Sequence, residues 1–256
     1  LAEAGQKVWQ ILPLGPVDFG YSPYQSPSAF AGNPMLIDLD DLVRREWLQA
    51  ADVKVLFPGT SSFVDFERVW AFKQKCLKKA YTHFRKTGGE QSPEYLRFCE
   101  REKAWLGDYA LFMAAKHDFK HEDWTKWPEA VKRRTPKALR ELADRIEEHV
   151  GFQKFQQFLF DEQWTKLHDY AKGKGIEILG DMPIFVSADS ADVWANQGLF
   201  DLNLDGTPKT VAGVPPDYFS ATGQLWGNPQ YDWDAMRDEK YKWWIARFKK
   251  LFRFVD

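Results

Sequence analysis

The spacing of apolar residues divides the chain into short strand-like runs and long helical stretches. Residues 8–14 and 176–185 are compact apolar runs bounded by glycine or proline, a pattern that favours fully buried strands. From about residue 65 to residue 149 the apolar side chains recur every three to four positions, as they do along one face of a helix. Further helices are predicted over residues 136–150, 151–172 and 240–251.

The order of these elements indicates a parallel sheet or barrel. The predicted helix at 151–172 ends at a glycine-containing turn, and the run at 176–185 then leads into a polar tip. Helix, turn and buried strand in this order form the repeating unit of parallel α/β folds. We therefore expect residues 8–14 and 176–185 to be parallel, neighbouring strands, with the helical stretch between them emerging from the rim.

Three loops combine glycine and proline with aromatic and acidic residues. The loops at 18–34 and 180–200 are associated with the two predicted strands, so they should share the rim where barrel enzymes build their active sites. The loop at 211–233 is long and aromatic, which suits a lid over a substrate. A structural interpretation stays open, in which the aromatic residues anchor the loops and Asp181 caps a helix or pairs with an arginine.

The composition is compatible with sugar binding and gives no indication of nucleic-acid binding or of a membrane-spanning segment. Aromatic residues make up 16% of the chain, with 12 Trp and 20 Phe. Exposed aromatic rings suit sugar binding, because a pyranose has an apolar face that stacks on such a ring, although core packing uses the same residues. A net charge of −2 gives no indication of nucleic-acid binding, and no apolar run approaches membrane-spanning length.

Candidate metal ligands do not form a convincing site. Cys76 and Cys99 lie in helix-like stretches without metal-ligand spacing, so we expect reduced thiols in a cytoplasmic protein. Residues 201–206, with Asp201, Asn203 and Asp205, resemble part of a calcium loop. The closing glutamate of such a loop is missing, so a turn is the better interpretation. The sequence predicts no metal and no cofactor.

Four strings of the sequence resemble the signature segments of the amylomaltases, the bacterial 4-α-glucanotransferases of the wider α-amylase superfamily. In order along the chain they are "WQILPLGP", "SPYQSPSAFAGNP", "GDMPIFVSADSADVWAN" and "VAGVPPDYFSATGQLWGNPQYDW". The strings span most of residues 8–233, in the order that the family has them.

The resemblance implies an α/β fold, part of a (β/α)8 TIM barrel with a mainly helical inserted subdomain. Residues 1–44 would form a barrel part with a strand and an active-site loop, and residues 45–150 the helical insertion. Residues 151–256 would form a second barrel part with a helix, a strand and the substrate-covering loop. The implied activity is transfer of an α-1,4-glucan segment to glucose or an oligosaccharide acceptor by a retaining double displacement.

The resemblance also implies substrate-binding positions for α-1,4-glucans and maltooligosaccharides. Tyr24 would stack on the glucose just before the cleaved bond, and Asp181 would form hydrogen bonds with hydroxyls of that sugar. Two further residues would lie on the mobile loop over the cleft and three would line the glucan groove, namely Asp217 and Phe219, then Gln224, Trp226 and Asn228. Beside Asp181, we expect Asp189, Asp192 and Trp194 to shape and cap their loop.

The family's nucleophile lies in an Arg-Ile-Asp-His-Phe strand, and residues 253–256 imitate it only superficially. The run "RFVD" has two residues between arginine and aspartate where the family has one. Since side chains alternate along a strand, the extra residue would put Arg253 and Asp256 on opposite faces. We therefore expect the nucleophile and the acid/base residue beyond Asp256. The chain, whose ends cut through a predicted helix and an apolar run, is expected to be a fragment that is inactive alone.

Two other functions remain open at this point. One is an α-glucan hydrolase of the same superfamily, which would use the same binding residues without an acceptor sugar. The other, for the isolated chain, is a non-catalytic glucan-binding fragment, because the expected nucleophile is missing.

Overall fold

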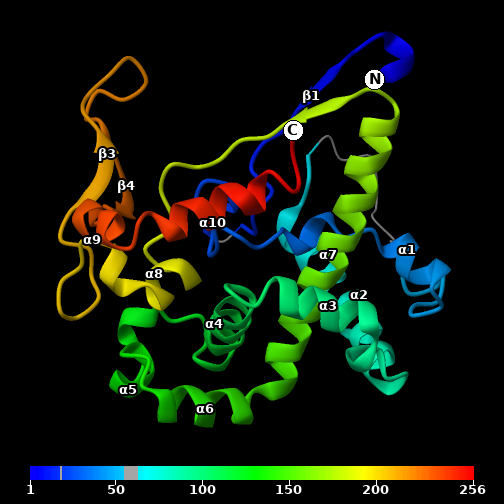
Figure 1. Ribbon diagram of the computed structural model, residues 1–256, viewed down its shortest axis with the longest axis horizontal. Coiled ribbons are helices and arrows are strands. Elements are labelled where there is room, and N and C mark those ends of the chain that lie inside the picture. Colours follow the sequence, from blue (N-terminus) through cyan, green and yellow to red (C-terminus); the bar gives the residue numbers. More distant parts are fainter. Residues whose placement is uncertain (18, 55–62) are drawn as a thin grey trace.

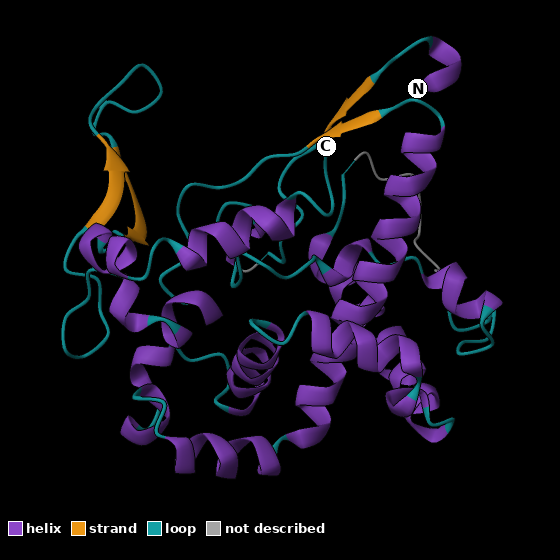
Figure 2. Ribbon diagram, in the orientation of Figure 1, coloured by secondary structure: helices purple, strands orange, loops and turns teal. Residues whose placement is uncertain are grey.

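The computed structural model describes residues 1–17, 19–54 and 63–256. Asp18, which opens the first predicted loop, and residues 55–62, within the predicted helical insertion, lie outside the described residues. Figure 1 shows two separate strand pairs, one beside the chain termini and one at the opposite side, with helices between and below them. The secondary-structure colouring of Figure 2 makes the dominance of helix plain.

A short parallel sheet joins two distant parts of the chain. Strand β1 (Val8–Gln10) pairs in parallel with β2 (Glu177–Leu179), with Trp9 opposite Ile178. This confirms the prediction that the two apolar runs are parallel neighbours. The assigned strands are shorter than predicted, because only three residue pairs form the ladder before each run turns into its loop.

The prediction that both strands are fully buried is wrong. Ile178 is completely buried, but Val8 and Leu179 are 49% and 50% exposed. Apolar residues on a strand become buried only where a neighbouring layer covers them. Within the described part of the chain, α7 covers one face of this pair and the other face stays accessible.

Helices make up most of the remaining structure, and local signals in the sequence begin several of them. Asp65 accepts a hydrogen bond from the backbone of Arg68 at the start of α2, and Ser92 caps α3 with Pro93 in the first turn. The helices are α1 (Leu39–Arg44), α2 (Phe66–Lys86), α3 (Pro93–Arg101), α4 (Leu106–Asp118), α5 (Glu129–Lys132), α6 (Pro136–Arg145), α7 (Glu147–Gly173), α8 (Ala191–Ala195), α9 (Trp233–Asp238) and α10 (Lys242–Leu251).

Short 3-10 helices join several of these elements. They are Ala2–Ala4, Phe19–Tyr21, Pro34–Leu36, Gly89–Gln91, Trp124–Lys126 and Gln197–Leu199.

Helix boundaries differ from the predicted ones at several places. The predicted helix at 136–150 ends at Arg145, and α7 begins two residues later, because Ile146 leaves the helical conformation with φ −115° and ψ 26°. Helices α8 and α9 were not predicted, since each has only five or six residues and shows no full apolar period.

Two apolar cores hold the helices together. One is built around α7, where Phe155 and Leu159 meet α2 and α3, and it reaches Ile178 of β2. The other is built around α4, α8 and the segment leading into α10, with Trp194 and Phe112 fully buried. Trp105 packs against both cores, so the helical region and the segments around the strands form one connected body.

The predicted loop at 211–233 contains an antiparallel hairpin instead. Strands β3 (Val211–Val214) and β4 (Gln224–Pro229) pair with a register irregularity between Val211 and Gly213. Proline and glycine around the turn hid the strand pattern in the sequence. Figure 1 shows the hairpin extending away from the helices, with α10 running from its base toward β1 and β2.

The terminal apolar run leaves α10 through a turn and reaches the free edge of β2. The backbone N–H of Asp256 donates to the Ile178 carbonyl at 3.0 Å, and the Asp256 carboxylate accepts from the Ile178 N–H at 2.9 Å. No strand is assigned to residues 252–256. The single pair of bonds nevertheless places this segment beside β2, on the side away from β1.

Candidate functional site

A tyrosine and a carboxylate from the two predicted rim loops meet. The Tyr24 hydroxyl donates to Oδ2 of Asp181 at 2.7 Å. Tyr24 follows β1 and Asp181 follows β2, so the pair lies beyond the C-terminal ends of two parallel strands. The hydrogen bond to Asp181 raises the pKa of Tyr24. Tyr24 is 45% exposed, which leaves it accessible to a ligand.

The pair borders a small cavity of about 70 Å³. Its walls come from the loops after both strands and from α10. Its lining includes Tyr24, Asp181, Pro183, Phe185 and Arg247. A carboxylate beside aromatic rings can accept hydrogen bonds from hydroxyl groups while a ring covers an apolar face.

The three acidic and aromatic residues after Asp181 have structural contacts, as predicted. Asp189 forms a salt bridge with the buried Lys116 of α4. Burial raises the pKa of Asp192 to about 6, and its Oδ2 accepts a 2.7 Å bond from the Ala29 N–H. Trp194 is fully buried and donates to the Val131 carbonyl at 3.2 Å. The N-cap of α8 itself is Ser190.

The β3–β4 hairpin presents the remaining predicted site residues. Phe219 at its tip is 87% exposed, and Asp217 accepts hydrogen bonds from the backbone N–H groups of Phe219 and Ser220. Asp217 thus shapes the tip. On β4, Gln224 accepts from the Trp226 indole at 3.1 Å, and the Trp226 side chain is 42% exposed.

The hairpin is tied to the Tyr24–Asp181 pair through Gln25, a residue that the sequence analysis missed. The Gln25 amide donates to the Trp226 carbonyl at 3.1 Å and to Oδ1 of Asn228 at 3.2 Å. Asn228 is buried and donates to the Val186 carbonyl at 2.8 Å. Gln25 adjoins Tyr24, so consecutive residues contact two different loops. The signal in the sequence that could have identified Gln25 was its position in the "SPYQS" string.

The structure therefore brings some predicted residues together and leaves others apart. Tyr24, Asp181, Trp226 and Asn228 are linked by hydrogen bonds through Gln25 or through the 181–186 segment. Asp217 and Phe219 lie at the hairpin tip, and among the described residues neither forms a hydrogen bond, ion pair or ring contact with the Tyr24–Asp181 pair.

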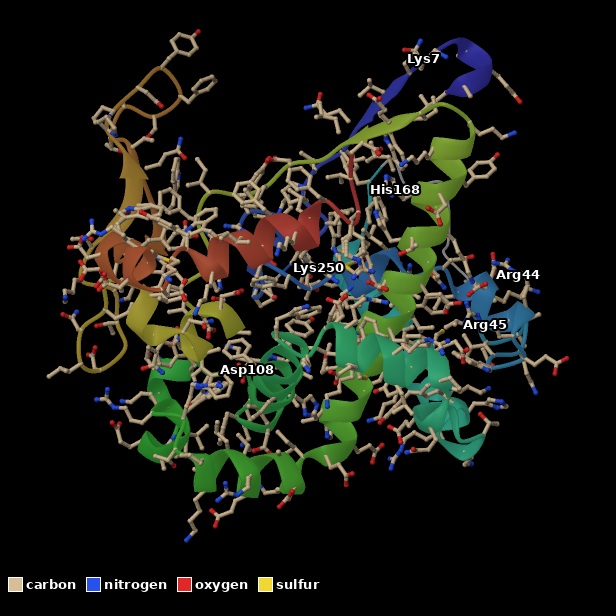
Figure 3. The ribbon with its side chains drawn as sticks, in the orientation of Figure 1. Lys7, Arg44, Arg45, Asp108, His168 and Lys250 are labelled. Atoms are coloured by element: carbon tan, nitrogen blue, oxygen red, sulfur yellow. The ribbon has the colours of Figure 1, made fainter. Side chains whose placement is uncertain are left out.

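Arg253 and Asp256 have separate partners. The Asp256 carboxylate accepts from the Ile178 N–H and lies 3.1 Å from Nε2 of His168, which Figure 3 labels on α7. The Ile178 hydrogen bond and His168 lower the pKa of Asp256. Arg253 forms salt bridges with Glu102 and Asp161. Both residues are thus engaged within the fold.

The described residues contain no group of three or more His, Cys, Asp or Glu side chains that could hold a metal ion. Asp205, in the segment that resembles a calcium loop, accepts hydrogen bonds from the backbone and the hydroxyl of Thr207. This is the predicted turn. Among the helices described, none combines the length and apolarity that crossing a bilayer requires.

Comparison with known proteins identifies close relatives along the whole chain. A family model described as 4-alpha-glucanotransferase matches residues 1–256. The 4-alpha-glucanotransferase of Thermus thermophilus is 48% identical over 260 residues, covering 100% of this chain and 51% of that protein. The enzyme of the same name from Synechocystis is 46% identical over 259 residues, again covering 100% of this chain and 51% of the relative.

A solved structure agrees with these matches. The amylomaltase of Streptococcus agalactiae, solved in complex with acarbose, superposes with a TM-score of 0.94 at 40% identity. The match covers 100% of this chain and 52% of that one. The chain spans about half the length of the curated relatives it matches.

Proposed function

Because the chain belongs to the 4-alpha-glucanotransferase family, we propose that it supplies glucan-binding residues of an enzyme that disproportionates α-1,4-glucans. Such an enzyme moves an oligoglucosyl segment from a donor to glucose or an oligosaccharide acceptor. The hydrogen bond between Tyr24 and Asp181 carries this proposal. It unites an accessible aromatic ring and a carboxylate where two parallel strands end, which is the rim that barrel enzymes use.

In this proposal each residue has a distinct task. Tyr24 stacks on the sugar that precedes the cleaved bond, and Asp181 accepts hydrogen bonds from its hydroxyls. The hairpin covers the glucan, with Asp217 shaping the tip that carries Phe219. Three residues of β4 line the groove: Gln224, Trp226 and Asn228.

The reaction itself would be a retaining double displacement through a covalent glycosyl-enzyme. We assign the nucleophile and the acid/base residue to positions outside these 256 residues. The contacts of Asp256 and Arg253 within the fold support this assignment, because neither residue lines the cavity beside Asp181.

The fold division belongs to the same proposal. Residues 1–44 and 151–256 are parts of a (β/α)8 barrel, and residues 45–150 are a helical insertion. The parallel pairing of β1 with β2 supports it, since these strands come from the two proposed barrel parts. We place the reaction in the cytoplasm, where the free thiols of Cys76 and Cys99 would stay reduced.

Incubating the full-length gene product with maltotriose tests the activity. The proposal expects glucose together with a ladder of oligosaccharides longer than the substrate. Products that are only shorter than maltotriose would instead identify an α-glucan hydrolase. An unchanged substrate would reject both activities.

A further inference from the structure

The backbone that follows Asp181 is held by side chains rather than by a strand ladder. Residues 182–186 are assigned to neither a helix nor a strand, yet three of their carbonyls accept hydrogen bonds from side chains. Asn228 donates to Val186, Tyr231 donates to Ile184 at 2.8 Å, and Arg247 donates to both Pro183 and Ile184. Arg247 thus contacts the two carbonyls that lie closest to Asp181 within this set.

Arg247 is an unusual residue for this task, because it is a buried cation. Its side chain projects from α10, is only 3% exposed, and packs beside the rings of both Trp243 and Trp244. No salt bridge to it is formed by any residue that the structure describes. Its hydrogen-bond partners are the two carbonyls and, at 3.5 Å, the Tyr231 hydroxyl.

Burying a charge without an ion pair is costly, so packing alone would favour an apolar side chain here. The planar guanidinium offers donors in a fixed fork, which an apolar residue or a lysine cannot reproduce. The fork at Arg247 contacts consecutive carbonyls of one segment. Its rigid geometry therefore fixes the direction of that backbone.

The segment fixed in this way directly follows Asp181, the proposed sugar-binding residue. Pro183 is two residues after Asp181, and Arg247 lines the same cavity as Tyr24 and Asp181. A rotation of the 183–184 backbone would displace the Asp181 carboxylate relative to the Tyr24 ring. The carboxylate whose charge acts on Arg247 is that of the buried Asp192, on α8.

We propose that Arg247 is a positioning residue for glucan binding, which acts by holding the Pro183–Ile184 backbone so that Asp181 meets the sugar in one orientation. This inference rests on the proposed function of Asp181. Arg247 does not have to touch the glucan, since its fork is directed at the backbone carbonyls.

A double-mutant cycle in the full-length gene product separates positioning from general stability. The variants are Arg247→Met, Asp181→Asn and their combination. Acarbose binding is followed by tryptophan fluorescence below the unfolding transition of each variant, and maltotriose transfer is measured in parallel. Arg237→Met, which removes an exposed arginine of α9, is the matched control.

We expect Arg247→Met to weaken acarbose binding by about tenfold, the factor that corresponds to losing one charge-assisted hydrogen bond. In the Asp181→Asn background the same substitution should change binding by less than about twofold, because its target is already lost. Tyr231→Phe should give a smaller loss that also vanishes in that background. Tyr231→Phe keeps the aromatic ring, so this variant tests the inference if Arg247→Met does not fold.

Equal losses from Arg247→Met, or from Tyr231→Phe, with and without Asp181→Asn would overturn the inference, as would unchanged binding. Failure of the proposed function looks different. In that case the wild-type protein does not bind acarbose, or Asp181→Asn leaves binding intact.

Discussion

The Tyr24 hydroxyl and the Asp181 carboxylate, 157 positions apart in sequence, lie 2.7 Å apart in the structure. The bond engages Oδ2 of Asp181, while Oδ1 receives no hydrogen bond from the described residues. One oxygen is therefore held by the protein and the other remains able to accept a hydroxyl. The Asp181 carboxylate is therefore fixed in orientation by Tyr24 and can still accept a hydrogen bond from a ligand.

Substitutions at this pair should weaken glucan binding by different routes. Tyr24→Ala removes the stacking ring, and Tyr24→Phe removes only the hydrogen bond that orients Asp181. Asp181→Asn should cost the most, about 10- to 100-fold in acarbose affinity, because hydrogen bonds to a charged group are the stronger ones. Tyr170→Phe, at an exposed position of α7, is the control. Wild-type affinity in both Tyr24→Ala and Asp181→Asn would contradict the assignment.

The turn of the hairpin should be sensitive to a single methyl group. Gly223 has φ +76°, and a Cβ there would lie 2.5 Å from the Val214 carbonyl oxygen. Gly223→Ala should therefore open the β3–β4 turn and speed limited proteolysis within residues 215–223. Gly198→Ala is the control, since a Cβ at that position meets no atom within 4 Å. Equal cleavage rates in the two variants would show that the turn tolerates the side chain.

The sequence predicted those features of the fold that depend on local pattern and strand direction. Asp65 and Ser92 cap helices that periodicity had indicated. The parallel pairing of β1 and β2 followed from the helix-turn-strand order, and it implied that the loops carrying Tyr24 and Asp181 would meet. Connectivity determines these features, so one sequence is enough to predict them.

Features that depend on distant neighbours were missed. The exposure of Val8 reflects which layers cover the sheet, which an apolar run cannot reveal. Gln25 and Arg247 donate hydrogen bonds to carbonyl or amide oxygens far along the chain. A single sequence does not indicate which distant group a polar side chain will bind. The spacing of Trp243, Arg247 and Lys250 does place all three on one helix face, which was a signal that Arg247 is buried.

A buried ionic cluster between α10, α7 and the end of α3 should contribute to stability. Glu102 is 4% exposed and accepts from Lys250 at 2.9 Å, with Arg101, Arg253 and Trp105 as further donors. Figure 3 labels Lys250 near the centre of the molecule, beneath α10. Burial alone would raise the pKa of Glu102, but Lys250 and the donated hydrogen bonds outweigh it and lower the pKa to about 2.

Removing the Glu102 charge leaves Lys250 buried with less compensation. Glu102→Gln should therefore cost about 3–5 kcal/mol in the free energy of unfolding, measured by urea denaturation at pH 7. Burial lowers the pKa of Lys250, and the Glu102 charge opposes this effect. Four donors surround the Glu102 carboxylate and keep it ionised. Glu100→Gln, at an exposed pair with Lys103, should change stability by less than about 0.5 kcal/mol. Similar values for both variants would contradict the prediction.

Asp192 should make the protein less stable as the pH rises through the mildly acidic range. Its folded-state pKa is raised to about 6 by burial, whereas an unfolded aspartate has a pKa of about 3.9. Between these values the native state binds more protons than the unfolded state, so stability falls as pH increases from about 4 to about 6. Each pKa unit corresponds to about 1.4 kcal/mol, which gives a total of about 2–3 kcal/mol.

The measurement is the free energy of unfolding from pH 4 to pH 7 for the wild type and Asp192→Asn. The amide oxygen of asparagine can still accept the Ala29 hydrogen bond, so the variant keeps this contact while losing the titration. Its stability should lack the decline that Asp192 contributes in this window. Asp234→Asn, which removes an exposed carboxylate paired with Arg237, should retain the wild-type slope. If Asp192→Asn and the wild type had the same slope, Asp192 would not be the group that titrates. The charge of the buried Arg247, which lowers the pKa of Asp192, would then hold that carboxylate ionised throughout the range.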